Sequence, residues 1–112
     1  MHSSFHDTAA VARFDEAKLQ KVNLFEPPRM FCDVYCLLPG QTQKVHAHEG
    51  SDKIYHVLTG RAQVSIGDEV REVGPGITAV APADVEHGIC NVGDEPCTVL
   101  VVMAPHPSFV AR

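Results

Sequence analysis

The sequence of 112 residues predicts a single all-β domain, folded as a sandwich or barrel. Three observations indicate this class. Several short segments alternate apolar and polar residues with a period of two, glycine and proline separate these segments, and few residues show the periodicity of a helix. An apolar content of 45% and a charged content of 21% are typical of a globular domain, and this length can bury a core without disulfide bonds.

The chain divides into an arm and a β domain. Residues 1–25 begin small and polar, and we expect an N-terminal arm that is partly disordered or forms an edge strand. Residues 26–112 contain the alternating segments and are expected to form the β domain. In the first of these segments, 30–38, each even position is apolar while Asp33 interrupts the other face, which predicts a strand.

Later segments predict further strands. Residues 61–66 alternate again, and the Gly67-Asp68 pair after them fits a type II′ hairpin turn, whose first residue needs a positive φ. The short apolar segment 77–82 follows a Gly-Pro-Gly break. Residues 97–104 are apolar on both faces, as expected for a strand that is buried on both sides.

Charge and composition argue against several functions. A net charge of −5 gives no basic face for nucleic acid or anionic lipid, so we expect neither as a partner. The sequence shows no signal-like N-terminus and no apolar run as long as a bilayer span, which predicts a cytoplasmic location away from the membrane. The four cysteines form no Cys-x-x-Cys pair, and we interpret them as packing residues rather than zinc ligands.

Three histidines form the candidate metal site. His46 and His48 are alternate residues of an expected strand, so their rings share one face about 6.6 Å apart along the chain. His87 follows a proline-containing turn and begins another strand, which can face the first pair in a closed barrel. Three neutral imidazoles with open positions suit one divalent ion of Fe, Zn, Ni, Mn or Cu. The alternative is a set of histidines whose hydrogen bonds are satisfied inside a polar barrel.

Two motifs resemble those of the cupin superfamily. The first runs from Gly40 through five residues to the His-Ala-His triplet at 46–48, then to Lys53, and after six residues to Gly60. The second comprises Gly76, Pro82, Asp84, His87 and Asn91. Residues 61–75 separate the two motifs, as in small single-domain cupins. The resemblance implies a jelly-roll β-barrel, a metal held by the three histidines, and a homodimer.

Two positions depart from the pattern of this family. Cupins with a four-residue metal site have a glutamate where this chain has Lys53, and an ammonium beside a dication is repelled by several kcal/mol in a partly dry pocket. We therefore expect Lys53 to turn away, to pair with Asp52 or Glu49, or to lose its proton. Asp84 stands where the family usually has glycine, and we expect it to orient a loop or a histidine ring nitrogen.

The resemblance is compatible with a metal site that lacks the glutamate, because some cupin dioxygenases bind iron through three histidines alone. A site with two net positive charges favours a small anionic ligand. Lys53 and Tyr55 share one strand face and are expected to line the pocket, although a core position for Tyr55 is an equal alternative. His2, His6 and His106 lie near the ends of the sequence, and we expect no specific role for them.

Three functions fit these observations. The first is a metal-dependent enzyme, such as a dioxygenase or isomerase, that acts on a small anionic substrate. The second is a binding or sensor barrel that holds such a molecule without converting it. The third is a metal-free barrel with vestigial histidines. The sequence identifies no general base, so it assigns no catalytic residue.

Overall fold

The computed structural model describes residues 4–26, 29–47 and 49–107, and the regular secondary structure in these residues is almost entirely β strand. The one α-helix among the described residues, α1, is one turn long (Thr8–Val11). The strands are β1 (Gln20–Phe25), β2 (Phe31–Leu37), β3 (Thr42–His46), β4 (Asp52–Thr59), β5 (Ala62–Ile66), β6 (Glu69–Val73), β7 (Thr78–Ala81), β8 (His87–Asn91) and β9 (Cys97–Ala104). The all-β class is therefore confirmed.

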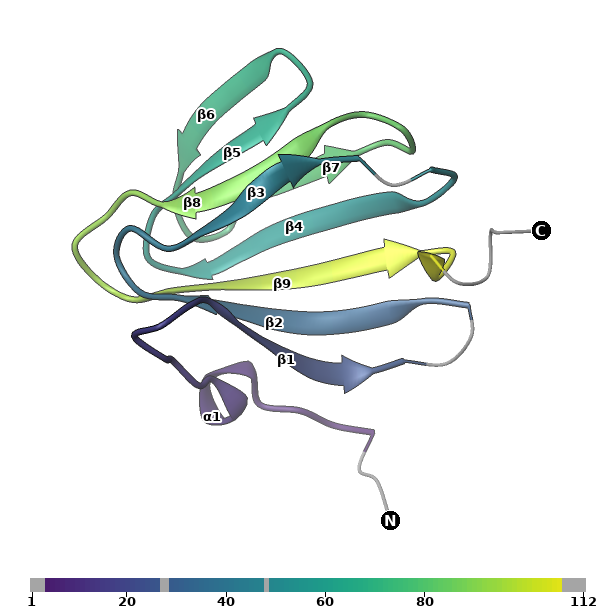
Figure 1. Ribbon diagram of the computed structural model, residues 1–112. Helices are drawn as coiled ribbons and strands as arrows, with labels where there is room; N and C mark the ends of the chain where they lie inside the picture. The colour runs from purple at the N-terminus through teal and green to yellow at the C-terminus, as the bar shows by residue number, and fades with distance from the viewer. Residues whose placement is uncertain (1–3, 27–28, 48, 108–112) are drawn as a thin grey trace.

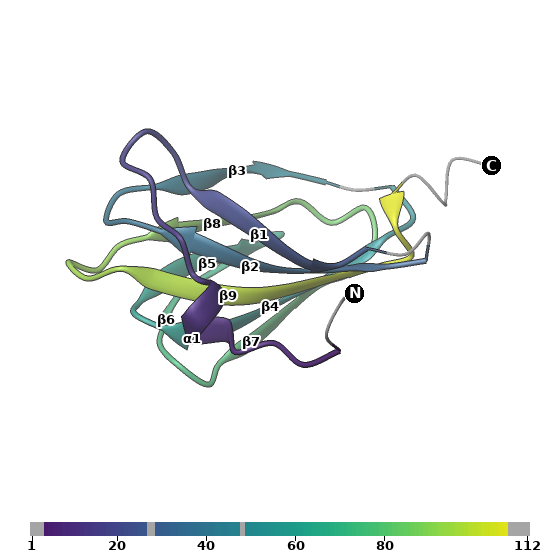
Figure 2. The same cartoon turned by 90° about the horizontal axis from the view of Figure 1, so that it is seen from below.

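Two antiparallel sheets face each other and form a jelly roll (Figure 1). One has five strands in the order β1-β2-β9-β4-β7, and the other has four in the order β3-β8-β5-β6. Consecutive strands often lie in different sheets, so the two histidine motifs, on β3 and at the start of β8, become neighbours within the four-stranded sheet. Figure 2 shows the same two layers from below, with α1 and the segment that follows it passing in front of the five-stranded sheet.

The main core lies between the sheets. Buried side chains from both sheets meet there; among them are Leu37, Val57, Val64, Ile89 and Val99. They alternate with outward-facing residues along each strand, as the period of two predicts. The expected β9 strand is present in the middle of the five-stranded sheet, and its apolar residues pack on both faces.

The outer face of the five-stranded sheet carries a second, smaller cluster. Val22, Val34 and Cys36 are buried there, and Val11 of α1 packs against them. This packing explains why β2 is apolar at its even positions: those residues lie under the N-terminal segment. The odd positions, which include Asp33, point into the barrel.

The special backbone positions agree with the local sequence. Gly67 has φ 58°, the positive value that a type II′ turn requires at its first central residue. Asp84 has φ 71°, so it occupies the left-handed conformation that favours glycine. All four cysteines are free thiols, and Cys36 and Cys97 are buried, as the packing interpretation predicts.

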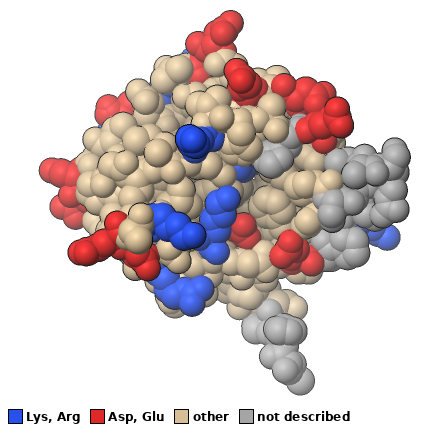
Figure 3. All heavy atoms as spheres, in the orientation of Figure 1, with Lys and Arg blue, Asp and Glu red and all other residues tan. Residues whose placement is uncertain are grey.

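The surface is mixed in charge. Figure 3 shows acidic side chains around much of the outline of one face and a smaller group of Lys and Arg near its middle. Within the described residues, no helix is long and apolar enough to cross a membrane.

Candidate functional site

His46 and His87 face each other inside the four-stranded sheet. They are register partners on β3 and β8, and their ring centroids lie 4.5 Å apart at an interplanar angle of 57°. His87 is buried, with 1% of its surface exposed, whereas His46 is half-buried. The fold thus brings together two of the three histidines that the sequence selected. His48, the third, lies outside the described residues.

Both rings are oriented by a backbone carbonyl two residues earlier in the chain. His46 Nδ1 lies 2.7 Å from the carbonyl oxygen of Lys44, and His87 Nδ1 lies 3.0 Å from that of Val85. Because a carbonyl only accepts hydrogen bonds, each Nδ1 is the protonated donor, and the lone pair of the neutral ring is on Nε2. Burial lowers the pKa of His87, and the nearby Lys53 and His46 lower it further, so the neutral ring is favoured.

Of the two roles expected for Asp84, orienting a histidine ring nitrogen is filled by the carbonyl of the neighbouring Val85. The Asp84 side chain is exposed, and it is the Val85 backbone that fixes the ring nitrogen of His87. Asp84 contributes a left-handed residue to the turn before β8, in which the Val85 N–H donates to the Pro82 carbonyl at 3.1 Å.

A β-bulge decides which residues of β3 point inward. Gln43 pairs with Ile89 and His46 pairs with His87, so β3 spans three steps where β8 spans two. The extra residue places Gln43 and His46 on the same interior side, although their sequence positions have opposite parity. Gly88 allows the two strands to approach at this point, because a Cβ there would lie only 3.0 Å from the carbonyl oxygen of Gln43.

Lys53 points into the barrel and ends among hydroxyl and amide groups. Only 1% of its surface is exposed, and its Nζ donates to the hydroxyl of Tyr35 at 3.1 Å and to Oε1 of Gln43 at 3.2 Å. Nζ also lies 5.2 Å from the ring centroid of Tyr35 and 5.0 Å from that of Tyr55. The side chain therefore neither turns away nor pairs with Asp52, whose carboxylate accepts from the backbone of Ala83 instead.

Burial changes the acid–base properties of this amine. Desolvation lowers the pKa of Lys53 to about 7; the like charge of Lys21 adds to the decrease, and Asp33 opposes it. Among the described residues, no carboxylate forms an ion pair with Lys53. The remaining expectation, loss of the proton, is the one that this environment favours.

Tyr55 connects the lysine with the histidines. Its hydroxyl donates to Gln43 Oε1 at 2.7 Å, and its ring centroid lies 6.0 Å from that of His87. Gln43 in turn donates from Nε2 to the hydroxyl of Tyr35 at 3.1 Å. We call this group the polar end of the barrel. Its members are Tyr35, Gln43, His46, Lys53, Tyr55 and His87.

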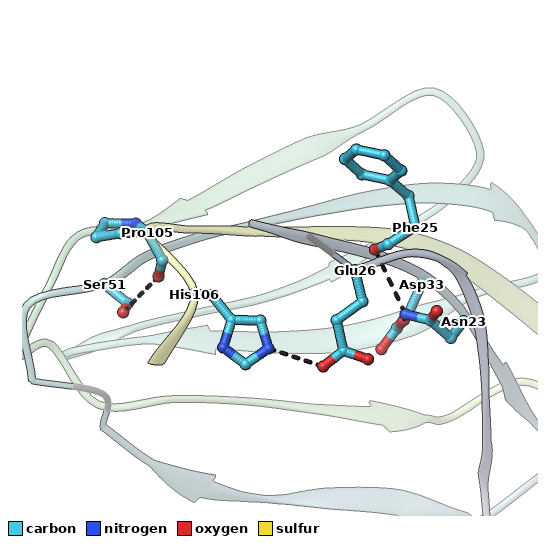
Figure 4. Close-up of polar contacts among 7 residues, drawn as sticks. All are labelled: Asn23, Phe25, Glu26, Asp33, Ser51, Pro105 and His106. Atoms are coloured by element: carbon cyan, nitrogen blue, oxygen red, sulfur yellow. Dashed lines mark hydrogen bonds and ion pairs between the residues drawn. The ribbon is translucent and has the colours of Figure 1, made fainter. Parts of the chain in front are cut away.

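Sequence reasoning missed Gln43 and Tyr35. The alternation of side chains along β3 would place Gln43 on the outer face. The bulge turns it inward, and the sequence carries no clear signal for the bulge. Tyr35 shares its strand face with Asp33, so a polar residue two positions away was the available signal. The Asp33 carboxylate accepts a 2.8 Å hydrogen bond from Asn23 (Figure 4), yet burial raises the pKa of Asp33.

The C-terminal segment is tied to the β1–β2 connection beside this end of the sheet. His106 lies 2.7 Å from the carboxylate of Glu26 and stacks edge-on against Phe31, and Ser51 donates to the carbonyl of Pro105 (Figure 4). His106 thus makes a structural contact that its place near the end of the sequence did not indicate, because the contact joins residues that are 80 positions apart.

Comparison with known proteins agrees with this fold and motif arrangement. The chain matches the model of the cupin domain family over residues 33–103. It is similar to the solved structure of the protein TT1209 from Thermus thermophilus, with 45% identity, a TM-score of 0.89, and coverage of 92% of this chain and 98% of that one.

Other relatives extend the comparison. A Klebsiella pneumoniae protein with a double-stranded β-helix domain has 25% identity, a TM-score of 0.86, and coverage of 93% of this chain and 91% of that one. The uncharacterized protein SCO3923 of Streptomyces coelicolor is 36% identical over 70% of this chain and 73% of its own length. Two further relatives match over 53% of their lengths. On the evidence of both motifs, the fold and these matches, the chain belongs to the cupin domain family.

Proposed function

We propose that this cupin holds one divalent metal ion through His46, His48 and His87 and uses it to bind a small anionic molecule in the barrel. The facing pair of His46 and His87 carries the proposal. Among residues 4–26, 29–47 and 49–107, no three His, Cys, Asp or Glu side chains are grouped for a metal, and His48 would supply the third ligand.

The donor set suits such an ion. Each described ring donates from Nδ1 to a carbonyl, so each can offer Nε2 to a metal. Two imidazoles bound to one ion at ~2.1 Å and at right angles have centroids roughly 4.5 Å apart. His46 and His87 already have this separation, 4.5 Å. Imidazole ligands are compatible with Fe, Zn, Ni, Mn or Cu.

The charge of the site favours an anion. A bound divalent ion supplies a Lewis acid with open positions, and three neutral imidazoles leave its two charges uncompensated. The Tyr55 ring packs edge-on against His87, and the Lys53 amine lies 5.0 Å from the centroid of the same Tyr55 ring. Where related cupins place a glutamate, this chain has Lys53, which adds no negative charge beside the metal.

Metal-dependent anion binding tests the proposal. The protein is purified without a metal-affinity step and stripped with a chelator. It is then titrated calorimetrically, first with Mn²⁺ or Zn²⁺ and then with oxalate. We expect about one ion per chain, and oxalate binding only to the loaded form.

The control variant is His56→Ala, on the outer face of β4, which should keep both the metal stoichiometry and the oxalate binding. Equal oxalate binding by the stripped protein would contradict the proposal. Dioxygen consumption with candidate substrates then separates conversion from binding.

We also propose that the protein forms a homodimer through the outer face of the five-stranded sheet. A register-aligned row crosses that face through Phe25, Cys32, Val102, Ile54 and Val80. Phe25 is 51% exposed and Val80 is 54% exposed, so the row is an apolar surface that a second copy would cover. Light scattering should give twice the mass of the chain for the wild type and a monomer for Val80→Lys. A wild-type monomer at high concentration excludes the dimer.

A further inference from the structure

We propose that the groove between the edge strands β6 and β7 holds an uncharged apolar chain of the molecule whose anionic group is bound at the histidines. The inference rests on the proposed function, because it concerns the ligand of that same site. It narrows the ligand class to molecules with one anionic, metal-chelating end and one uncharged apolar end.

The groove lies where the two sheets end. β6 is the edge strand of the four-stranded sheet and β7 is the edge strand of the five-stranded sheet, and these two described strands do not pair with each other (Figure 1). The space between them has a volume of about 520 Å³. Sites for small molecules have volumes of about 300–1,000 Å³, so the groove is large enough for part of a ligand.

Ile66 connects the groove with the histidine pair. It lines the groove, and it is the register partner of His87 on one side and of Glu69 on the other. His46 pairs with His87 in the same way. Partners across antiparallel strands project from the same face of a sheet, with Cβ atoms about 4.5–5.5 Å apart. The histidines, Ile66 and Glu69 therefore form one row, and a molecule bound at the histidines reaches the groove by crossing Ile66.

The residues beside this row give the groove an apolar lining. Val64 is buried in the main core, and Val73 and Ala79 pack against that core as partly buried residues. Ile77, at the start of β7, is 47% exposed and also lines the groove. An apolar chain in the groove would remove this surface from water, which favours binding in proportion to the area covered.

The charged residues of the groove disfavour a second anionic group on the ligand. Glu69, Arg71 and Glu72 of β6 line it, so two carboxylates face one guanidinium. Arg71 already pairs with Glu69 at 2.8 Å, and Glu72 lies 3.6 Å from Arg61. A carboxylate at the far end of the ligand would lose hydration beside an excess of negative charge. The far end is therefore uncharged.

The dependence of affinity on chain length tests the inference. Pyruvate, 2-oxobutyrate, 2-oxopentanoate and 2-oxohexanoate are titrated calorimetrically into the Mn²⁺-loaded protein. Each presents the same carboxylate and carbonyl oxygens to the metal, so differences in affinity report the chain. We expect the affinity to rise about fourfold with each methylene that enters the groove.

A second comparison tests the charge of the far end. 2-Oxoglutarate has the chain of 2-oxopentanoate with a carboxylate in place of the terminal methyl group. We expect it to bind the loaded protein about tenfold more weakly than 2-oxopentanoate, because its second carboxylate meets the acidic residues of β6. Tighter binding of 2-oxoglutarate would overturn the assignment of an uncharged chain to the groove.

A matched pair of variants locates the effect. Ile77→Ser removes apolar surface from the groove, whereas Val70→Ser changes an exposed residue of β6 that does not line it. Ile77→Ser should lower the gain in affinity from pyruvate to 2-oxohexanoate several-fold and leave the affinity for oxalate, which has no chain, at the wild-type value. Val70→Ser should match the wild type with all three molecules.

The outcomes separate the two proposals. Oxalate binding together with affinities that do not rise with chain length, or that rise equally in Ile77→Ser, overturns the role of the groove and leaves the metal site standing. The chain-length series in the wild type decides the matter even where Ile77→Ser does not fold. A loaded wild-type protein that binds neither oxalate nor any 2-oxo acid overturns the proposed function and this inference with it.

Discussion

The two ends of the barrel interior differ in chemistry although the same strands build both. Along β4, the inward residues change from Lys53 and Tyr55 to Val57, and along β2 from Tyr35 to Leu37. The apolar end, around Leu37, Val57, Val64 and Val99, stabilises the fold by excluding water. At the polar end the rings of Tyr35 and Tyr55 still pack in the core, but Lys53 is buried there without an ion pair to any described carboxylate. This difference indicates that the apolar end supplies stability, whereas the polar end carries the proposed site.

The largest effect on stability is expected at the apolar end. Leu37 is fully buried, and Leu37→Ala removes its packing and leaves a cavity, so the free energy of unfolding should fall by about 2–5 kcal/mol. Chemical denaturation measures the change. Metal stoichiometry of the folded variant should stay at the wild-type value. A loss of metal from folded Leu37→Ala would show that packing at the apolar end also controls metal binding at the polar end.

A substitution of Lys53 at the polar end is expected to raise the free energy of unfolding, whereas Leu37→Ala lowers it. The folded-state pKa of Lys53 is lowered to about 7, so between pH 7 and its ordinary value the unfolded chain binds more protons than the native protein. The contribution of Lys53 to unfolding free energy therefore rises with pH in this window, by at most about 1.4 kcal/mol per pH unit.

Lys53→Met removes this titration. Relative to the wild type, the variant should be most stabilised at pH 7 and below, and the advantage should shrink towards pH 10. Denaturation curves measured at several pH values in this range test the prediction, with Lys18→Met as the exposed control. Parallel pH profiles for wild type and Lys53→Met would show that the amine keeps its ordinary pKa.

The smallest effect is expected where the two strands of the site approach. An alanine Cβ at Gly88 would lie 3.0 Å from the carbonyl oxygen of Gln43 and 3.1 Å from Cα of Val45, so β3 must shift. Gly88→Ala should cost about 1 kcal/mol of stability and weaken metal binding about tenfold by moving His46. Gly93→Ala, whose Cβ has ordinary contacts at 3.5 Å, is the matched control. Equal metal affinities in the two variants would refute a positioning role for Gly88.

The sequence predicts the fold and the location of the site better than the contacts inside it. Alternation and turn residues are local, so they identify the strands, and the resemblance of the two motifs to those of cupins correctly indicated that His46 and His87 lie together. The environment of Lys53 depends on the bulge that turns Gln43 inward, and parity cannot foresee an inserted residue. The contact between His106 and Glu26 joins distant segments, which no local pattern encodes.

The metal content of the protein tests the central claim most directly. The protein is purified without a metal-affinity step, and its metal is quantified by elemental analysis in the wild type, His48→Ala and His87→Ala, with His56→Ala as the control. We predict about one divalent ion per chain in the wild type and the control, and little in the other two. Wild-type metal content in folded His48→Ala and His87→Ala would contradict the three-histidine site.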